Sequence, residues 1–556
     1  MNIPNFSTRI VSSLEKALIT DRPEQHPVLE RQSVLIGEKL DFQLLILDED
    51  PEIASTRNLK AEVTGLPCDV TCRAAVSVYA DMPTYSHDTS KGTLYYIESK
   101  SGTYPDVLEP LDSGKYFRPL RGRTSSLWFT CVPRKAGIYT VTVTLKEADR
   151  PVSENTFLLT VIAAELPEQE LIFTEWFHCD CLSTYYHVPV FSPEHWKIIS
   201  SYMKCASENG VNCLLTPIFT PPLDTEIGGE RPTVQLVGVK ADNNGYTFDF
   251  SLLNVWFELA RKNGIKYFEI SHFFSQWGAK FAPKIIAEKD GKPCRIFGWN
   301  TPGTEGEYPR FLSCFLPELI AFLREQGVLE SCIFHISDEP NETQLEGYMK
   351  AKKIVSPYLE GCTIADALSS VAFYKSGAVN TPIPATNHIE PFLEEPISQR
   401  WAYYCCGQWD KVGNRFIAYP SARNRILGVQ LYKFGIKGFL HWGFNYWYSM
   451  GSRRLINPYL CQSGEGQVPS GDAFSVYPAQ DGTPYESIRL NVFREAIQDI
   501  SVLSLCEKFI GRARVTALID TLAGDKLTFS SYPADPEYIL RLREEINRII
   551  AENVQA

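Results

Sequence analysis

The chain has 556 residues, a formal net charge of −12, and 44% hydrophobic against 22% charged residues. This length exceeds one ordinary core, so we expect two or three globular domains. Nucleic acid and anionic membranes bind to concentrated positive charge. The chain is acidic and has no Lys/Arg-rich run, so neither is expected as a partner. No segment approaches the roughly 18 apolar residues of a membrane span, and no signal peptide is seen. We therefore expect a cytoplasmic protein.

The 15 cysteines are odd in number and scattered along the chain, which predicts reduced thiols rather than a disulfide framework. Residues 178–181 read His-Cys-Asp-Cys and resemble a set of metal ligands. However, Cys-x-Cys is not the usual Cys-x-x-Cys zinc knuckle, and no second ligand pair follows at a suitable spacing. We predict no metal site and no cofactor.

The first 165 residues have an all-β pattern. Short alternating runs such as 41–47 and 139–145 are separated by turn-rich stretches. At Gly137 a glycine turn enters an alternating strand, as in a late strand of an immunoglobulin-like sandwich. We predict such a sandwich over residues 1–165, with a long loop at 81–114.

A different sequence pattern recurs from residue 166: an amphipathic helix, a glycine and an apolar strand. The first helix begins at Ser192-Pro193, an N-cap followed by a proline at the first helical position. It ends at Gly210, and the strand 211–216 follows. A helix-ending glycine before an apolar strand is typical of βα units in a parallel sheet. The same pattern recurs at Gly264, Gly327, Gly361 and Gly435.

Three further strands are predicted at 171–177, near Thr386 and at 401–405. The total of eight predicts an α/β fold with a TIM-type (β/α)8 barrel over residues 166–500. A doubly wound open sheet is the alternative, and it is disfavoured because no Gly-rich phosphate fingerprint follows the first strand. Residues 501–556 are predicted to form a helical extension packed on the barrel, with a charged helix at 536–553.

The most informative segment is 334–340, a short apolar strand that ends in Asp338 and Glu339 and is stopped by Pro340. Catalytic groups of barrel enzymes lie at the carboxyl ends of the strands, so both acids are candidate catalytic residues. Aromatic and amide side chains at the other strand ends would suit a sugar site. The substrate-binding candidates are Trp176, His272, Trp277, Asn387, Tyr404, Trp442, Asn445 and Trp447.

A retaining glycosidase usually needs a general acid and a separate carboxylate nucleophile about 5 Å apart. In the large barrel clan of such enzymes the nucleophile ends the seventh strand, but here strand 401–406 ends without a carboxylate. Two adjacent carboxylates suit a different scheme, in which the 2-acetamido oxygen of the substrate attacks the anomeric carbon. One acid then protonates the leaving oxygen, and the other holds the amide N–H.

The segments 334–340, 405–407, 435–443 and 471–478 resemble glycoside hydrolase family 123, and the resemblance covers about residues 170–505. It implies a retaining, exo-acting β-N-acetylgalactosaminidase that uses substrate-assisted catalysis. By matching position, Asp338 would stabilise the oxazoline intermediate and Glu339 would be the general acid/base. These roles require a protonated Glu339, whose pKa the charge of Asp338 would raise, and an ionised Asp338.

The expected partner is a glycan or glycoconjugate with terminal β-linked N-acetylgalactosamine. Two alternatives stay open: a β-N-acetylhexosaminidase with another sugar specificity, and a non-catalytic carbohydrate-binding protein on the same fold. The sequence leaves the aglycone and the oligomeric state open.

Overall fold

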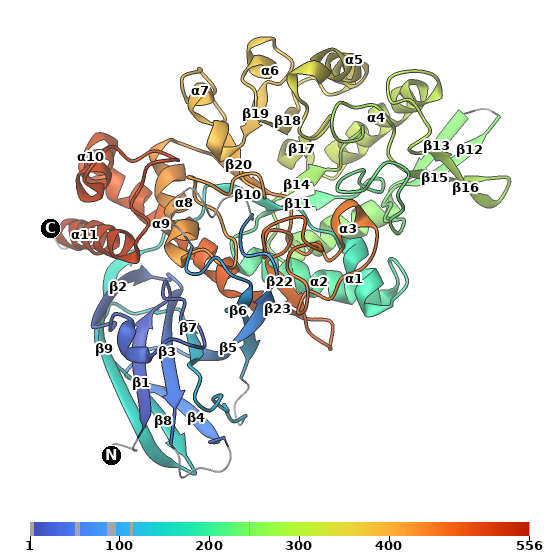
Figure 1. The fold of residues 1–556 in the computed structure, drawn as a ribbon. Helices are drawn as coiled ribbons and strands as arrows, with labels where there is room; N and C mark the ends of the chain where they lie inside the picture. Colours follow the sequence, from blue (N-terminus) through green and yellow to red (C-terminus); the bar gives the residue numbers. More distant parts are fainter. Residues whose placement is uncertain (1–4, 51–55, 86–95, 112–114, 244, 555–556) are drawn as a thin grey trace.

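A computed structural model describes residues 5–50, 56–85, 96–111, 115–243 and 245–554. Figure 1 shows the N-terminal sheets on one side of the molecule and the βα units on the other. None of the helices in these ranges combines the length and apolar character that crossing a bilayer requires.

Eight parallel strands form one sheet in the order β19-β18-β17-β14-β11-β10-β21-β20. A parallel bridge between Ala385 and Tyr403 joins the ends of this sheet, so the barrel is nearly closed. The strands follow one another in chain order, without the reversal of a doubly wound sheet, and the predicted eight-stranded barrel sheet is confirmed. They are β10 (Ile172–Glu175), β11 (Cys213–Thr216), β14 (Tyr267–Ile270), β17 (Cys332–Phe334), β18 (Thr363–Leu368), β19 (Thr381–Pro384), β20 (Trp401–Tyr403) and β21 (Gly438–His441).

Helices surround this sheet. The N-cap predicted at Ser192 is confirmed, because its hydroxyl accepts a hydrogen bond from the His195 N–H at 3.2 Å. The main helices of the barrel region are α2 (Pro193–Glu208), α3 (Ser251–Lys262), α4 (Glu307–Glu325), α5 (Leu345–Val355), α8 (Ser421–Lys433) and α9 (Ile488–Ile510).

Two further sheets form a sandwich in the N-terminal part. One has the order β2-β9-β8-β4 and the other β1-β3-β7-β5-β6-β23-β22. Phe42 stacks on Phe129 within the larger sheet and packs on Phe157 of the smaller one, with ring centroids 5.1 and 5.0 Å apart. The immunoglobulin-like assignment stays a prediction. The strands are β1 (Phe6–Ser12), β2 (Arg31–Ile36), β3 (Leu40–Asp48), β4 (Leu59–Thr64), β5 (Val70–Ala80), β6 (Gly102–Pro110), β7 (Ser125–Cys131), β8 (Gly137–Glu147), β9 (Arg150–Glu165), β22 (Val476–Pro478) and β23 (Pro484–Ser487).

The predicted loop 81–114 is wrong in part, because strand β6 occupies its second half. The sequence did not predict this strand because it contains Pro105, and proline has no N–H to donate to a neighbouring strand. The β5–β6 register shifts next to it, between Val76 and Ser77, and this irregularity accommodates the proline. Residues 86–95 and 112–114 of this stretch lie outside the described residues.

The barrel region contributes to the sandwich. Strand β23 pairs antiparallel with β6 through Glu486–Leu108 and Ser487–Val107. Just beyond it, the buried Arg489 binds Asp106 of β6 through two hydrogen bonds of 2.9 and 2.8 Å. The two parts of the chain are therefore joined by a shared sheet and a buried ion pair.

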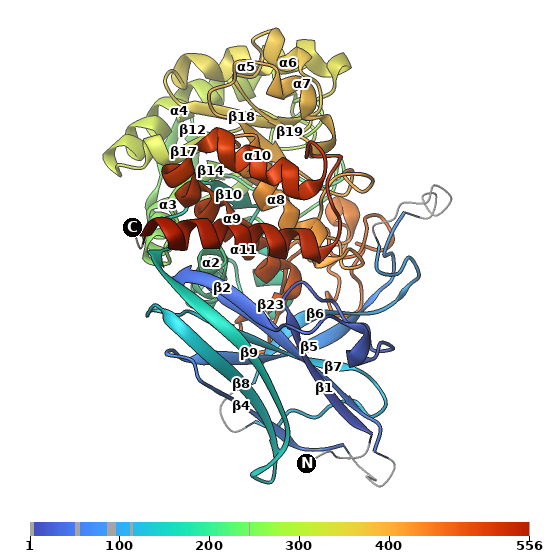
Figure 2. The ribbon, with the colours of Figure 1, turned by 90° about the vertical axis from the view of Figure 1, so that its left-hand side faces the viewer.

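The C-terminal region is helical, as predicted, and its last helix α11 (Pro536–Val554) matches the expected 536–553. The sequence did not predict α10 (Arg512–Ala523). The predicted domain boundary at residue 501 falls inside α9, so the barrel and the extension share a continuous helix. Figure 2 shows α11 lying across the junction, where the amide of Asn547 donates to the Ser33 carbonyl of β2 at 3.0 Å.

Candidate active site

A cavity of about 150 Å³ lies at the carboxyl ends of the barrel strands, where Asp338 and Glu339 follow β17. The two acids therefore face the same space. The cavity is lined by Trp176, Asp224, Gln276, Trp277, Asp338, Glu339, Ala367, Tyr403, Cys405, Cys406, Leu440, Trp442 and Met450.

Glu339 has an unusual backbone, which explains how adjacent residues reach one cavity. Its φ is +43°, in the left-handed region that residues other than glycine rarely adopt. In a regular strand, adjacent side chains point to opposite faces. The turn removes this constraint, and the Glu339 N–H donates to the Ala367 carbonyl at 3.1 Å. The Tyr403 hydroxyl donates to Glu339 Oε1 at 2.6 Å. Backbone strain of this kind is concentrated at functional sites.

Asp338 is 4% exposed and accepts one hydrogen bond of 2.8 Å, from the side-chain amide of Gln276. Burial raises the pKa of Asp338 well above its usual range, and the negative charge of Glu339 adds to the effect. This differs from the expectation of an ionised Asp338. The reason is that its hydrogen-bond donor is a neutral amide, which stabilises the carboxylate too weakly to offset burial next to a second acid.

Asp224, on the loop after β11, is a third carboxylic acid in the cavity, and sequence reasoning missed it. Its φ is +53°. Its N–H donates to Gln276 Oε1 at 2.7 Å, and its carbonyl accepts from Tyr446 at 2.9 Å and Ser452 at 2.8 Å. Burial, reinforced by the charge of Glu339, raises the pKa of Asp224 to about 7. Its Oδ2 atom is buried and has no hydrogen-bond partner among the described residues.

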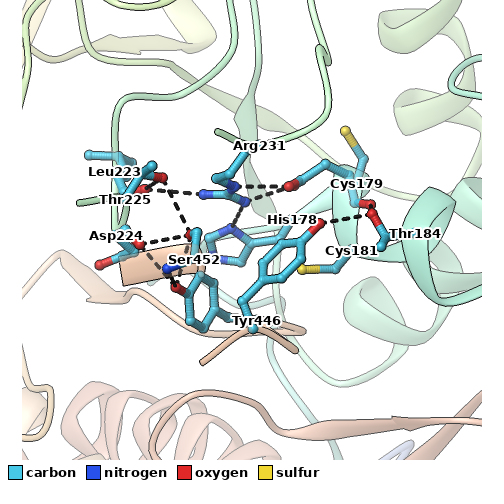
Figure 3. A network of polar contacts seen from close by, with 12 residues as sticks. His178, Cys179, Cys181, Thr184, Leu223, Asp224, Thr225, Arg231, Tyr446 and Ser452 are labelled. Atoms are coloured by element: carbon cyan, nitrogen blue, oxygen red, sulfur yellow. Dashed lines mark hydrogen bonds and ion pairs between the residues drawn. The ribbon is translucent and has the colours of Figure 1, made fainter. Parts of the chain in front are cut away.

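A buried arginine holds the loop of Asp224 in place (Figure 3). Arg231 binds Asp180 through two hydrogen bonds of 2.8 and 2.7 Å and donates to the Leu223 carbonyl at 3.1 Å. It also donates to His178 Nδ1 at 3.1 Å, while His178 Nε2 donates to the Trp442 carbonyl at 2.9 Å. The network thus links the loop before Asp224 to the cavity residue Trp442.

The same network accounts for the His-Cys-Asp-Cys segment. Burial and the charge of Arg231 lower the pKa of His178 to about 4, so its imidazole is neutral. Burial alone would raise the pKa of Asp180, but the Arg231 guanidinium outweighs it and lowers this pKa. Both polar members of the segment therefore bind Arg231.

Three of the predicted substrate-binding residues, Trp176, Trp277 and Trp442, line the cavity. The indole N–H of Trp176 donates to Glu269 Oε1 at 2.8 Å, and that of Trp442 donates to Asp472 Oδ2 at 2.9 Å. These buried acids fix the orientation of both rings at the wall of the cavity.

The other five candidates lie outside the lining of this cavity, and their role in sugar binding stays a prediction. Tyr404 packs edge-on against Phe439 at 5.1 Å, because strand alternation turns Tyr403 toward the cavity instead. The amide of Asn445 binds the backbone N–H and carbonyl of His178 at 2.9 and 3.0 Å.

The remaining three have partners elsewhere in the structure. Trp447 is buried and its indole N–H donates to the Val476 carbonyl at 3.3 Å. Asn387 accepts a hydrogen bond of 2.9 Å from Gln408. His272 stacks on the ring of His335, with centroids 4.4 Å apart.

His335 is the centre of a buried charge cluster inside the barrel. Its Nε2 lies 2.8 Å from Glu269 Oε1 and its Nδ1 lies 3.4 Å from Asp366 Oδ1. Neither N–H points well enough at its oxygen for a hydrogen bond, so these contacts are ion pairs. Burial alone would lower the pKa of His335, but the two carboxylates outweigh it and raise this pKa to about 10.

The ligand atoms of His272, His335 and Asp366 lie within 4.8 Å of one another, as in a metal site. However, the two imidazole rings are stacked at 19°. The nitrogen lone pairs lie in the planes of the two rings, so in stacked rings they do not point at a common ion. In addition, both nitrogens of His335 face carboxylates. The ion pairs explain this cluster, and the expected absence of a metal stays a prediction.

The geometry combines three carboxyl groups with tryptophan rings and a tyrosine hydroxyl in one small cavity. Burial raises the pKa of two of these acids, Asp338 and Asp224, which allows a proton to be held near neutral pH. Such an arrangement suits general acid/base chemistry on a polar ligand with apolar faces, as a sugar has.

Residues 176–506 match the family model described as the catalytic domain of glycoside hydrolase 123. The structure is also similar to that of a family 123 glycoside hydrolase from Clostridium perfringens, analysed for glycolipid glycan hydrolysis. The TM-score is 0.73 at 17% identity, over 99% of this chain and 98% of the other. A family 39 glycoside hydrolase from Bacteroides cellulosilyticus aligns over 80% of both chains, at a TM-score of 0.32 and 11% identity. No curated protein matches the chain.

Proposed function

The chain belongs to glycoside hydrolase family 123, and we propose that it removes terminal β-linked N-acetylgalactosamine by retaining, substrate-assisted catalysis. The observation that carries this proposal is the placement of Asp338 and Glu339 at one strand end, facing one cavity. The full-length similarity to an enzyme studied for glycolipid glycan hydrolysis supports glycolipid glycans as a substrate class.

In the first step of the proposed reaction, the 2-acetamido oxygen attacks the anomeric carbon and the bond to the leaving oxygen breaks. Glu339 gives its proton to that oxygen, and Asp338 accepts a hydrogen bond from the acetamido N–H. In the second step, water attacks the anomeric carbon of the oxazolinium ion, the bond from this carbon to the acetamido oxygen breaks, and Glu339 takes up a proton from the water. Two inversions at one carbon give overall retention.

The position of the proton follows from the partners of each acid. An acetamido N–H that donates to Asp338 would stabilise its ionised form and lower its pKa. Substrate binding would then leave the proton on Glu339, whose Oε1 already accepts from Tyr403.

Asp224 suggests a second candidate function, because a third carboxyl in the cavity could serve as the nucleophile of an ordinary retaining glycosidase. A nucleophile must be ionised, and a pKa of about 7 leaves Asp224 largely protonated below neutral pH. We therefore assign Asp224 to binding a sugar hydroxyl with its unpartnered carboxyl oxygen. The ordinary mechanism would act on a plain galactoside, and this separates the two candidates.

The test is hydrolysis of para-nitrophenyl β-N-acetylgalactosaminide by the wild type and by Asp338→Asn. The corresponding N-acetylglucosaminide and plain β-galactoside are measured alongside. Activity restricted to the N-acetylgalactosaminide and abolished by the substitution would support sugar and mechanism together. Comparable activity on the plain galactoside would exclude the substrate-assisted mechanism, and preference for the glucosaminide would change the sugar.

A further inference from the structure

A second cavity of about 160 Å³ adjoins the catalytic one, and the two share Gln276 and Trp277 as lining residues. It contains neither of the adjacent acids. Its lining residues are Thr225, Ile227, Ser275, Gln276, Trp277, Lys280, Phe281, Trp299 and Gln344.

Trp277 stands between the two cavities on a strained turn. Its φ is +56°, and Gly278 and Ala279 follow with φ of +104° and +57°. Backbone conformations of this kind cost on the order of 1–3 kcal/mol for each residue other than glycine. The side chain is nevertheless 51% exposed, so burial of the indole does not repay this cost. The exposed indole is accessible to a ligand at the edge of the cavity.

Hydrogen bonds hold this turn rigidly. The Trp277 N–H donates to the Asp338 carbonyl at 2.9 Å, and the Gln344 amide donates to the Trp277 carbonyl at 2.7 Å. Gln344 also packs over Gly278, where an added Cβ would lie 3.0 Å from its side chain. The position of the indole is therefore tied directly to the backbone of a candidate catalytic residue.

Trp299 and Phe281 also line the second cavity. The indole N–H of Trp299 donates to the Gly229 carbonyl at 3.1 Å, and Phe281 packs edge-on against its ring at 6.1 Å. These contacts fix the ring of Trp299 as well. The lining of the second cavity thus includes two tryptophans, one held by its backbone and one by its indole N–H, and an indole is a surface on which the apolar face of a pyranose can stack.

The polar groups of the cavity are few and mostly engaged. Both ends of the Gln276 amide bind within the protein, and the Ser275 hydroxyl accepts from the Phe281 N–H at 3.1 Å. Lys280 forms no ion pair within the described ranges and is exposed at the rim. Recognition here would rest on stacking and a single flexible donor, which suits an uncharged ring better than a particular pattern of hydroxyls.

We propose that this second cavity binds the sugar from which N-acetylgalactosamine is cleaved, as a leaving-group subsite for a neutral hexopyranose. This inference rests on the proposed function of the catalytic cavity. Because stacking tolerates differences in hydroxyl configuration, the subsite accepts hexoses of different configuration as leaving sugars.

The test compares two substrates that share the cleaved sugar: a disaccharide with galactose as leaving sugar and the methyl β-N-acetylgalactosaminide. Trp299→Ala should lower kcat/KM for the disaccharide about tenfold, because an aromatic contact is lost. The methyl glycoside, which does not reach the second cavity, should change by no more than about twofold. Equal changes on both substrates, or no change on the disaccharide, would overturn the proposal.

A second variant tests the subsite independently, in case Trp299→Ala does not fold. Ile227 is 67% exposed, so Ile227→Arg leaves the core intact and places a long side chain in the cavity mouth. It should lower kcat/KM for the disaccharide alone, and an unchanged disaccharide rate would count against the subsite.

Failure of the proposed function is recognised separately. If the wild type hydrolyses neither substrate, saturation-transfer NMR with methyl β-galactopyranoside tests the subsite directly. A signal in the wild type that Trp299→Ala removes supports the second cavity. A signal of equal strength in both proteins, or none in the wild type, rejects it.

Discussion

His335→Gln removes the positive charge from the buried cluster of Glu269 and Asp366 while keeping a polar side chain that can donate. The three groups are at most 1% exposed, so water cannot replace the lost charge. Breaking a buried ion pair by removing one partner typically costs 3–5 kcal/mol, since the other charge is left uncompensated. We therefore expect a large loss of stability from a residue outside the cavity.

The pKa of His335 gives an independent magnitude and a pH dependence. A folded-state pKa of about 10 against an unfolded value of 6.5 stabilises the fold fully below pH 6.5. This contribution is lost as the pH rises from 6.5 through about 10. It amounts to about 4 kcal/mol at pH 7 and about 1 kcal/mol at pH 9. The penalty of His335→Gln should therefore shrink by about 3 kcal/mol between these pH values.

The assay is urea unfolding followed by tryptophan fluorescence at pH 7 and pH 9, for the wild type and the variant. His388→Gln is the matched control, because His388 is exposed and its loss should leave stability unchanged. A penalty below about 1 kcal/mol at pH 7, or one equal at both pH values, would refute an imidazolium at position 335.

Four further predictions concern the acids. Glu339→Gln should lower kcat/KM by about 10³ on natural glycosides, and by less on para-nitrophenyl glycosides whose leaving group needs no proton. Asp338→Asn should impair both kinds of substrate equally. Asp224→Asn should raise KM, and it removes a negative charge that raises the pKa of Asp338. The acid limb of its pH–rate profile, which reports the ionisation of Asp338, should therefore move to lower pH, whereas an unmoved limb would contradict this coupling. Asp106→Asn leaves the buried Arg489 without its counter-charge and should cost about 3–5 kcal/mol in urea unfolding, with no change expected for the exposed Asp149→Asn.

The barrel was predictable because short stretches of sequence identify its strands and helices. A helix-ending glycine followed by an apolar strand marks five of the eight units, and the eight strands lie close to where the sequence predicts them. Asp338 and Glu339 were found for the same reason, since Pro340 ends their segment. Strand β6 was missed because Pro105 reads as a turn, and its pairing with β23 depends on residues almost 380 positions away.

The rest of the site could not be predicted, because it depends on contacts between distant segments. Asp224 is placed by Gln276, Tyr446 and Ser452, and no pattern around Asp224 marks it. The choice between Tyr403 and Tyr404 depends on which face of a three-residue strand points inward. A shift of one residue reverses that choice.

Buried acids outside the catalytic cavity include two that are bound by arginines. Asp180 and Asp106 are fully buried, and each is bound by an arginine through two hydrogen bonds. The guanidinium of Arg231 lowers the pKa of Asp180, so this carboxyl stays ionised near neutral pH.

The acids of the catalytic cavity have a different set of partners. The carboxyl of Asp338 accepts from an amide and that of Glu339 from a phenol hydroxyl. Asp224 has an oxygen without a partner, and none of the three forms an ion pair with lysine or arginine within the described ranges. Neutral donors orient a carboxyl without fixing its charge, so a proton can be held there and transferred.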